Sequence, residues 1–320
     1  MLKTLKFVQG AIAKKDFVPA LTHFHIRDGY VLGYNGRLAL CSPIQLDLAA
    51  TPEGIPFVKA IATCEEEVAL SLTDNGRLAV RSGPFKAFIR CTQDPYPDIR
   101  PEGEFYEMDG NLLEGLRKLQ PFISEDASRP WSQGVLFDRH SAYATNNVIL
   151  TEFWLGYRVP KRINVPRTAV NELLRIGEEP LAMQANENSA TFYYGGNRWL
   201  KTQLYSLEWP DVERILNFQA LHKPVPQGLW KALHAMTAFV GEEGRVYLSP
   251  AGVATLSDFT ATDGASVELP LPGVNACFNL QQLLRLEEIA ESLDLPDSLE
   301  PRPCLFFGKS LRGAIMGMRR

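Results

Sequence analysis

The sequence predicts an α+β protein built from one module repeated three times in tandem. The first observation is a short aromatic-Pro-Asp-aliphatic signature, which occurs at residues 96–99 (YPDI) and again at 209–212 (WPDV), 113 residues apart. The second is that the segments before both signatures share one order, helical spacing followed by alternating apolar residues around a turn. A four-residue match alone is a frequent coincidence, but matching flanks indicate an internal repeat.

Each signature follows a predicted β-hairpin. In the first copy, the alternating segments 68–72 and 78–80 flank a turn at residues 74–76. In the second copy, a turn at residues 187–189 lies 113 positions further on and has flanks of the same kind. Apolar alternation with period two around residues that tolerate a positive φ is typical of a hairpin.

Two predicted helices accompany the hairpins. One begins after an aliphatic-Pro pair, at residues 55–56 in the first copy and 165–166 in the second, where the first N–H groups of a helix lack partners and proline is tolerated. The other opens each repeat with apolar residues at helical spacing: Leu2, Leu5, Val8 and Ile12; then Leu112, Leu113, Leu116 and Leu119; then Leu229, Leu233 and Met236.

These patterns divide the chain into domains of residues 1–104, 105–218 and 219–320, called repeats 1, 2 and 3 below. A strand-turn-strand pattern follows the first helix of each repeat, with turns at 34–36, 145–147 and 262–264. The third copy is the faintest. Its second helical stripe is short, and its closing strands flank a turn at 308–310 and alternate as far as Met318.

Composition places the chain among globular proteins of the cytosol. It is 45% apolar and 22% charged, and its net charge is −4. No apolar run is long enough for a membrane span, so we expect no membrane association. The five scattered cysteines form no C-x-x-C pair, which favours free thiols in a reducing cytoplasm.

Catalytic and metal-binding patterns are weak. Gly308-Lys309-Ser310 ends like a phosphate-binding loop, but Pro303 stands where the first glycine is needed. His23 and His25 could share one face of a strand, but no Cys or carboxylate pair completes a metal site. We therefore expect no enzymatic activity, no metal and no cofactor.

The threefold pattern resembles the bacterial DNA polymerase sliding clamp, the β subunit of DNA polymerase III. Three stretches carry the resemblance: VPRTAVNELLRIGEEPLAMQ, EWPDVERIL and the C-terminal AIMGMRR. They are similar to the "IPRK-x-x-x-ELxR" helix and following strand of that family, its "FPDYxRVxP" segment and its "VVMPMRL" ending. The resemblance covers essentially the whole chain and is best in repeat 2.

The resemblance implies three clamp domains per chain, with helices lining a ring and antiparallel sheets outside. It implies a head-to-tail homodimer that encircles duplex DNA without sequence preference. A DNA polymerase and a clamp loader would bind through short peptide motifs in a cleft between repeats 2 and 3. Two alternatives remain open: a clamp-like adaptor or decoy that binds replication proteins without encircling DNA, and an enzyme on the same scaffold.

Sliding on DNA requires basic residues on the inward helices, because phosphates are bound without reading bases. The predicted first helix carries Lys3, Lys6, Lys14 and Lys15, with no acid before Asp16. By position, Lys15 resembles a family arginine that contacts DNA, and Arg129 falls in a loop that the family places near DNA. The alternative is that such residues lie on ordinary solvated helix faces. The candidates are Lys3, Lys6, Lys14, Lys15, Arg117, Lys118, Arg129, Arg175 and Lys231.

The resemblance also suggests a peptide cleft and a ring contact. The cleft residues carried over by position are Ser132, Leu150, Pro210, Arg214, Ile215, Met316, Met318 and Arg319, and core packing is the alternative for the aliphatic ones. Ser132 replaces a family leucine, and Gly317 replaces the proline of the family's ending. Candidates for ring closure are Tyr96 and Ile99 against Phe239 and Val240, unless the last two cover their own sheet.

Overall fold

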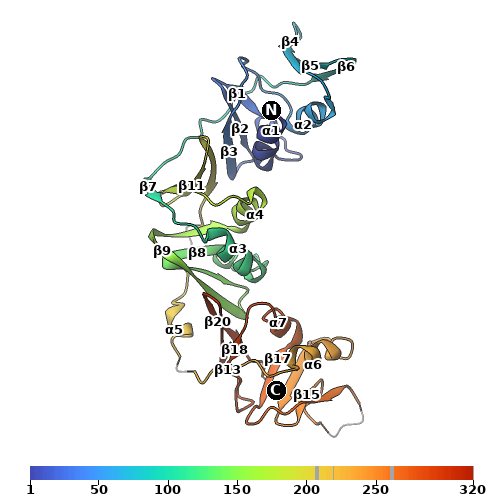
Figure 1. Cartoon of the computed structure of the whole chain (residues 1–320), viewed down its shortest axis with the longest axis vertical. Helices are drawn as coiled ribbons and strands as arrows, with labels where there is room; N and C mark the ends of the chain where they lie inside the picture. Colours follow the sequence, from blue (N-terminus) through green and yellow to red (C-terminus); the bar gives the residue numbers. More distant parts are fainter. Residues whose placement is uncertain (206–208, 219, 260–262, 320) are drawn as a thin grey trace. The chain divides into compact units, whose positions relative to one another are not determined.

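The structure is a computed structural model that describes residues 1–205, 209–218, 220–259 and 263–319 (Figure 1). Its chain forms two compact units. Unit 1 contains residues 1–113 and 165–206, and unit 2 contains residues 114–164 and 207–320. The chain crosses between the units three times, after residues 113, 164 and 206, and all three crossings fall within repeat 2. The division into three repeats therefore stays a prediction. Three residues named in the sequence patterns, Glu208, Thr262 and Arg320, lie outside the described part.

Unit 1 combines helices with a seven-stranded and a three-stranded antiparallel sheet. The larger sheet has the order β1-β2-β3-β12-β11-β10-β7 and the smaller one β4-β5-β6. Its helical segments are α1 (Leu2–Val8), η1 (Gln9–Ala11), η2 (Pro19–Thr22), α2 (Gly54–Thr63) and α4 (Arg167–Ile176). Its strands are β1 (His25–Arg27), β2 (Tyr30–Tyr34), β3 (Leu38–Pro43), β4 (Ala69–Leu72), β5 (Leu78–Ser82), β6 (Phe85–Ile89), β7 (Glu104–Glu107), β10 (Ala182–Ala185), β11 (Ser189–Tyr194) and β12 (Arg198–Gln203).

Unit 2 contains a six-stranded sheet in the order β13-β18-β19-β20-β9-β8 and a four-stranded sheet in the order β16-β15-β14-β17. Helix α3 (Leu112–Leu119) and strand β9 (Ile149–Pro166) each begin or end in unit 1. The other helical segments are η3 (Gln120–Phe122), η4 (Pro130–Ser132), α5 (Glu213–Leu216), α6 (Leu229–Met236) and α7 (Leu280–Leu284). The other strands are β8 (Gly134–Thr145), β13 (Lys223–Pro224), β14 (Arg245–Ser249), β15 (Gly252–Ala254), β16 (Ser266–Glu268), β17 (Ala276–Asn279), β18 (Ser292–Leu293), β19 (Pro303–Gly308) and β20 (Leu311–Met316).

The local patterns of the sequence are confirmed. Both predicted hairpins form, as β4-β5 and β10-β11, and the predicted helices appear as α2 and α4 within one or two residues of their expected starts. Two boundaries differ from expectation. Strand β20 ends at Met316 rather than Met318, because Met318 turns to donate its N–H to the Cys277 carbonyl. The predicted boundary between repeats 1 and 2, at residues 104 and 105, falls within β7, which pairs with β10.

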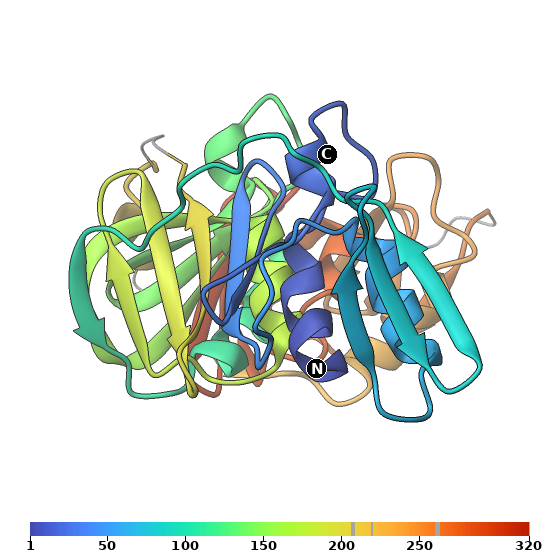
Figure 2. The same ribbon diagram turned by 90° about the horizontal axis from the view of Figure 1, so that it is seen from above.

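Each core forms where a helix buries one face against a sheet. In unit 1, α1 packs on β2 and β3 (Figure 1). Its residues Leu5, Phe7 and Val8 are buried. Strands β4–β6 form a small sheet beside α2, drawn in teal in Figure 2. In unit 2, α6 packs against β15 and α7, and α7 packs against β17. The apolar stripes read from the sequence are therefore the buried faces.

All five cysteines are unpaired, as their spacing predicts, and burial raises the pKa of the Cys41 thiol to about 12. No helix in the described ranges is long and apolar enough to cross a membrane. Within the same ranges, no three side chains of His, Cys, Asp or Glu lie close enough together to hold a metal ion.

Arg175 joins α4 to the end of α1. Its guanidinium donates to both carboxylate oxygens of Glu172 and to the main-chain carbonyls of Lys6 and Phe7, at 3.3 and 2.8 Å. Glu172 is buried, and its carboxylate occupies the space that a Cβ at Gly10 would need. The two helices can approach this closely only because residue 10 has no side chain.

Replacing Arg175 by methionine should lower the free energy of unfolding of unit 1 by about 2 kcal/mol, because the buried Glu172 carboxylate would lose its donor. Urea unfolding of the full chain measures this loss. The control is Arg100→Met, which breaks an exposed pair with Asp98 and should cost no more than about 0.5 kcal/mol. Equal losses in the two variants would show that Arg175 does not hold the helices together.

Candidate functional site

The four lysines at the start of the chain are exposed. Lys3 and Lys6 lie on α1, on the side opposite its buried residues. Lys14 and Lys15 do not lie on the first helix as predicted, because α1 ends at Val8 and η1 at Ala11, and they lie in the turn before η2. None of the four forms an ion pair with a residue that the structure describes. Lys3 helps to lower the pKa of Glu178, behind the larger effect of the hydrogen bond from Arg198. The lysines are therefore available to an external anion.

The turn that carries Lys14 and Lys15 also presents an aromatic side chain that sequence reasoning missed. Phe17 is fully exposed, and the Asp16 carboxylate accepts a hydrogen bond from the Val18 N–H at 2.9 Å. The sequence does show an aromatic residue close to two lysines, but a single residue has no periodic pattern from which its exposure could be predicted. Only the folded turn shows that Phe17 does not enter the core.

The other basic candidates fall into two groups. Arg117 on α3 and Lys231 on α6 are exposed and have no ion-pair partner in the described part of the chain. Lys118 instead pairs with Glu114 at 3.0 Å, donates to the Lys309 carbonyl and lies over the Phe153 ring. Arg129 donates to the Asn147 amide oxygen at 3.1 Å.

Interactions within the fold thus use part of the donor capacity of three candidates. Lys118 and Arg129 hold neighbouring segments of unit 2, and Arg175 holds α1 in unit 1. A packing role explains these three residues without any ligand. The charge that remains unneutralised lies on the first helix, the turn after it, Arg117 and Lys231.

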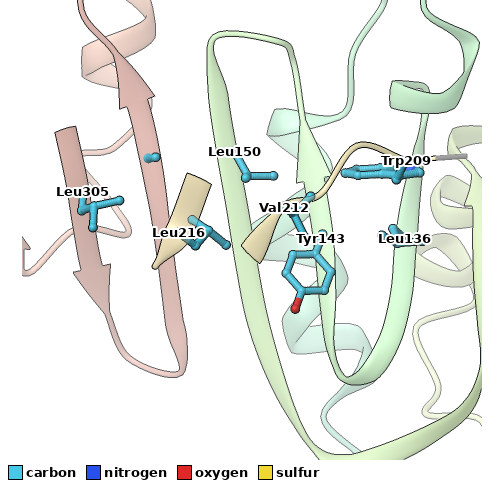
Figure 3. Packing of buried hydrophobic residues seen from close by; sticks show 8 residues of the cluster. Leu136, Tyr143, Leu150, Trp209, Val212, Leu216 and Leu305 are labelled. Atoms are coloured by element: carbon cyan, nitrogen blue, oxygen red, sulfur yellow. The ribbon is translucent and has the colours of Figure 1, made fainter. Parts of the chain in front are cut away.

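Two of the cleft candidates, Leu150 and Ile215, belong to one apolar cluster on the six-stranded sheet in unit 2. The segment that carries Trp209, Val212 and Leu216 crosses the strands that carry Leu136, Tyr143, Leu150 and Leu305 (Figure 3). Trp209 also meets Trp131 edge to face, with ring centroids 5.2 Å apart. Leu150 is 6% exposed, so it forms the floor of this cluster, and Ile215 packs at its side.

The rim of the cluster is exposed. Met316 is 46% and Val148 is 37% exposed, and the Met316 N–H donates to the Val148 carbonyl at 2.9 Å. Pro210, Arg214 and Arg319 are exposed as well, and Met318 is half-buried. The candidates therefore divide into a buried floor, an accessible apolar rim and two exposed arginines.

The two departures from the clamp pattern have local structural roles. Ser132 is fully buried in η4, where its hydroxyl donates to the Arg129 carbonyl at 2.8 Å. Gly317 donates its N–H to the Arg302 carbonyl at 3.4 Å, a bond that a proline could not make. Together with the bond from Met318 to Cys277, this contact holds the C-terminal segment against unit 2.

A buried carboxylate lies next to the cluster. Glu152 accepts hydrogen bonds from the hydroxyls of Ser141 and Tyr143, at 2.6 and 3.0 Å, and from the Arg312 guanidinium. Burial and the Glu152 charge raise the pKa of Tyr143. Arg312 also reaches the Asn217 side chain, just after α5. Sequence reasoning missed this network, although an acid at an inward position of a buried strand was a signal for it.

The ring-contact candidates differ in accessibility. The Tyr96 ring stacks on His25 with centroids 4.7 Å apart, and burial raises the pKa of its hydroxyl. Ile99 lines a pocket on the same sheet. The Tyr96 ring is thus used within unit 1, whereas Ile99 is half-buried beside that pocket, and the interface role of both stays a prediction. Phe239 is 59% exposed and Val240 is half-buried, so Phe239 does not cover its own sheet.

Comparisons with known proteins place the fold. No protein-family model matches the chain, and no curated protein matches it in sequence. The β sliding clamp of C. crescentus superimposes with a TM-score of 0.84 at 17% identity, covering 100% of this chain and 97% of that one. This chain has the β sliding-clamp fold. The predicted α+β class and the resemblance in architecture are confirmed.

Other solved clamps agree with this result. The DNA polymerase sliding clamp of Bacillus subtilis matches with a TM-score of 0.81 at 14% identity, covering 100% of this chain and 97% of that one. The Helicobacter pylori β clamp bound to a DNA ligase peptide matches with a TM-score of 0.76 at 17% identity, covering 99% and 97%. At these sequence identities the similarity establishes the fold of the backbone, and it does not establish the roles of individual side chains in this chain.

Replacing Glu152 by glutamine should lower the stability of unit 2 by about 2 kcal/mol, because Arg312 would face a neutral amide in a buried site. The double variant Glu152→Gln/Arg312→Met should recover about 1 kcal/mol of that loss, since no charge is then left unpaired. Urea unfolding of the two single variants and the double variant gives the coupling. Strictly additive losses would mean that the pair does not stabilise the sheet.

Proposed function

We propose that this protein is a DNA sliding clamp, a non-catalytic processivity factor that encircles duplex DNA and tethers a DNA polymerase. The observation that carries the proposal is the concentration of unneutralised lysines on α1 and the following turn of a clamp-fold chain whose net charge is −4. The solved clamps that this chain resembles include proteins described as DNA polymerase subunits. We place its work in the cytoplasm, where its free cysteines would stay reduced.

Charge placement supports sliding rather than sequence-specific binding. Lys3, Lys6, Lys14 and Lys15 offer ammonium groups on flexible stems, which suit phosphates but do not read base edges. Arg117 and Lys231, in unit 2, would supply further phosphate contacts of the same kind. An acidic remainder of the chain would repel DNA elsewhere and leave the basic surface as the one attractive path.

Ring closure would use the free edges of two small sheets. Among the described strands, β6 is the last strand of its sheet in unit 1, and β16 is the last strand of its sheet in unit 2. An edge strand presents unpaired N–H and C=O groups that can pair with another chain. In a head-to-tail dimer, β6 of each protomer would pair with β16 of its partner. The ring would then have two equivalent interfaces, and the free N–H and C=O groups of all four edge strands would be paired.

Side chains on these edges are complementary. Phe88 on β6 is 46% exposed, and we propose that it packs against the exposed Phe239 of the partner. Lys86 on β6 would then lie near Glu268 on β16, and both side chains are exposed. Phe88 thus takes the role first expected of Tyr96, because the Tyr96 ring is stacked within unit 1.

Partner binding would use the rim of the cluster in unit 2. Val148 and Met316 present exposed apolar surface beside the floor formed by Leu150, and Arg214 and Arg319 are exposed as well. A short peptide from a polymerase or a clamp loader would bury an aliphatic or aromatic side chain here. Methionine fits such a surface because its flexible thioether adapts to several partners.

Charge reversal of the lysines should weaken binding to duplex DNA and flatten its dependence on salt. The variant Lys14→Glu/Lys15→Glu should make the negative slope of log K against log salt shallower by about 2. The fourfold variant, which also has Lys3→Glu and Lys6→Glu, should make it shallower by about 4 in total. Fluorescence anisotropy of a labelled duplex measures the slope. The control is Arg158→Glu/Lys223→Glu, which makes the same change in net charge as the first variant at exposed strand positions. Equal slopes in wild type and the lysine variants would refute a DNA-facing α1.

Light scattering should give about twice the chain mass of 35.8 kDa. After long incubation with a nicked circular plasmid, the protein should stay bound in high salt and be released when the plasmid is linearised. Phe88→Asp should yield monomers and abolish this retention, because a carboxylate would be buried in the interface. Phe105→Asp, at an exposed position on β7, is the control. A monomeric wild type, or equal retention on circular and linear DNA, would favour the adaptor or decoy instead.

A further inference from the structure

Unit 1 contains a hairpin built like the one that borders the cleft in unit 2. In unit 2, the Asn146 side-chain oxygen accepts hydrogen bonds from the N–H groups of Val148 and Ile149, at 3.1 and 2.8 Å. In unit 1, the Asn35 side-chain oxygen accepts the same two bonds from Arg37 and Leu38, at 3.2 and 3.0 Å. The two turns therefore place the residues that follow them in equivalent positions.

The neighbouring strands match as well. The Met316 N–H donates to the Val148 carbonyl in unit 2, and the Gln203 N–H donates to the Arg37 carbonyl in unit 1. Two positions earlier on each of these strands, Ala314 lies opposite Leu150 and Lys201 lies opposite Ala39. The floor and the rim of the unit 2 cleft therefore each have a counterpart in unit 1.

The aromatic-Pro-Asp signature covers both sites. In unit 2, Trp209 and Val212 pack into the cluster that contains Leu150. In unit 1, Tyr96 stacks on His25, and Ile99, the counterpart of Val212, lines a pocket together with Ala39. The same covering segment thus borders a hollow in unit 1.

The hollow exists because the counterparts differ in size and polarity. The smaller side chain of Ala39 stands in place of Leu150, and a pocket of about 240 Å³ lies here. Its lining includes Tyr34, Arg37, Ala39, Ile99, Lys201 and Gln203, together with the two acids Asp98 and Glu102. Where the rim of unit 2 is apolar, with Val148 and Met316, the rim of unit 1 carries Arg37 and Gln203.

Charges around the pocket leave one cation without an anion. Lys201 pairs with Glu102 at 3.0 Å and donates to the Arg100 carbonyl, and Asp98 pairs with Arg100. Arg37 is exposed, and its guanidinium has no ion-pair or hydrogen-bond partner among the residues that the structure describes. A guanidinium without a partner at the mouth of a pocket favours a carboxylate, which it can bind through two parallel hydrogen bonds.

We infer that this pocket is a second peptide-docking site, which takes an extended segment carrying an acidic side chain next to a small aliphatic one. The carboxylate would bind Arg37, and the aliphatic group would fill the space between Ala39 and Ile99. The inference that the occupant is a peptide rests on the proposed function of the cleft in unit 2, whose backbone geometry this site repeats. The polar rim would exclude the apolar segments that suit the unit 2 cleft, so one chain could hold two different partners.

The test uses the full chain with its Ala, Ile, Leu, Val and Met methyl groups labelled for NMR. The probe is a terminally blocked peptide, acetyl-Gly-Val-Asp-Gly-amide, and the matched probe has Asn in place of Asp. We expect the Asp peptide to shift the methyl signals of Ala39 and Ile99 in a saturable way. The Asn peptide and the variant Arg37→Gln should each bind about tenfold more weakly. Acetate alone should bind more weakly than the Asp peptide, because it lacks the valine.

Three results would overturn the inference: no shift at Ile99 up to the solubility limit of the peptide, equal binding of the Asp and Asn peptides, or unchanged binding by the Arg37→Gln variant. Acetate that binds as well as the peptide would likewise reduce the site to an anion site. A parallel titration with acetyl-Gly-Leu-Phe-Gly-amide is read at Leu150, Val148 and Met316. Failure of that titration alone would count against the proposed cleft in unit 2, because the two readouts come from different residues.

Discussion

Pairing between strands that are distant in sequence is the constraint on which the rest of this structure depends. Strand β3 pairs with β12 in unit 1, and β9 pairs with β20 in unit 2, so each large sheet takes strands from two successive predicted repeats. This pairing explains why the compact units cut through repeat 2. It also sets the register that brings Ala39 opposite Lys201 and Leu150 opposite Ala314, and hence the walls of both proposed docking sites.

The same backbone frame supports different chemistry in the two units. Asparagine side chains close both hairpins, and a signature segment crosses both sheets, but the side chains on the frame diverge. In unit 2 the floor is filled by Leu150 and the rim is apolar. In unit 1 alanine opens a pocket, and a lysine, an arginine and a glutamine border it. Side-chain size and polarity, rather than backbone shape, would therefore separate the partners of the two sites.

Basic residues serve two purposes in this fold. Arg175 and Arg312 are held by the buried acids Glu172 and Glu152, and their hydrogen bonds tie helices and strands together. The lysines of α1 and the turn after it have no such partners, so their charge remains available to an external anion. A buried carboxylate requires a cation nearby, whereas an exposed lysine can stay solvated until phosphates replace the water.

The sequence by itself determined the elements: the hairpins around residues 74–76 and 187–189, the helices that open each repeat, and the α+β class all followed from periods and turn residues that act over a few positions. The tertiary structure alone decided the use of individual side chains. The Tyr96 ring stacks on His25, and Arg175 donates hydrogen bonds to carbonyls at the end of α1. Glu152 accepts hydrogen bonds from side chains of β8 and β20. These outcomes depend on strand register and on contacts between distant residues. Arg175 and Phe7, and likewise Arg312 and Glu152, are more than a hundred positions apart in the sequence, so no local sequence pattern could predict their contacts.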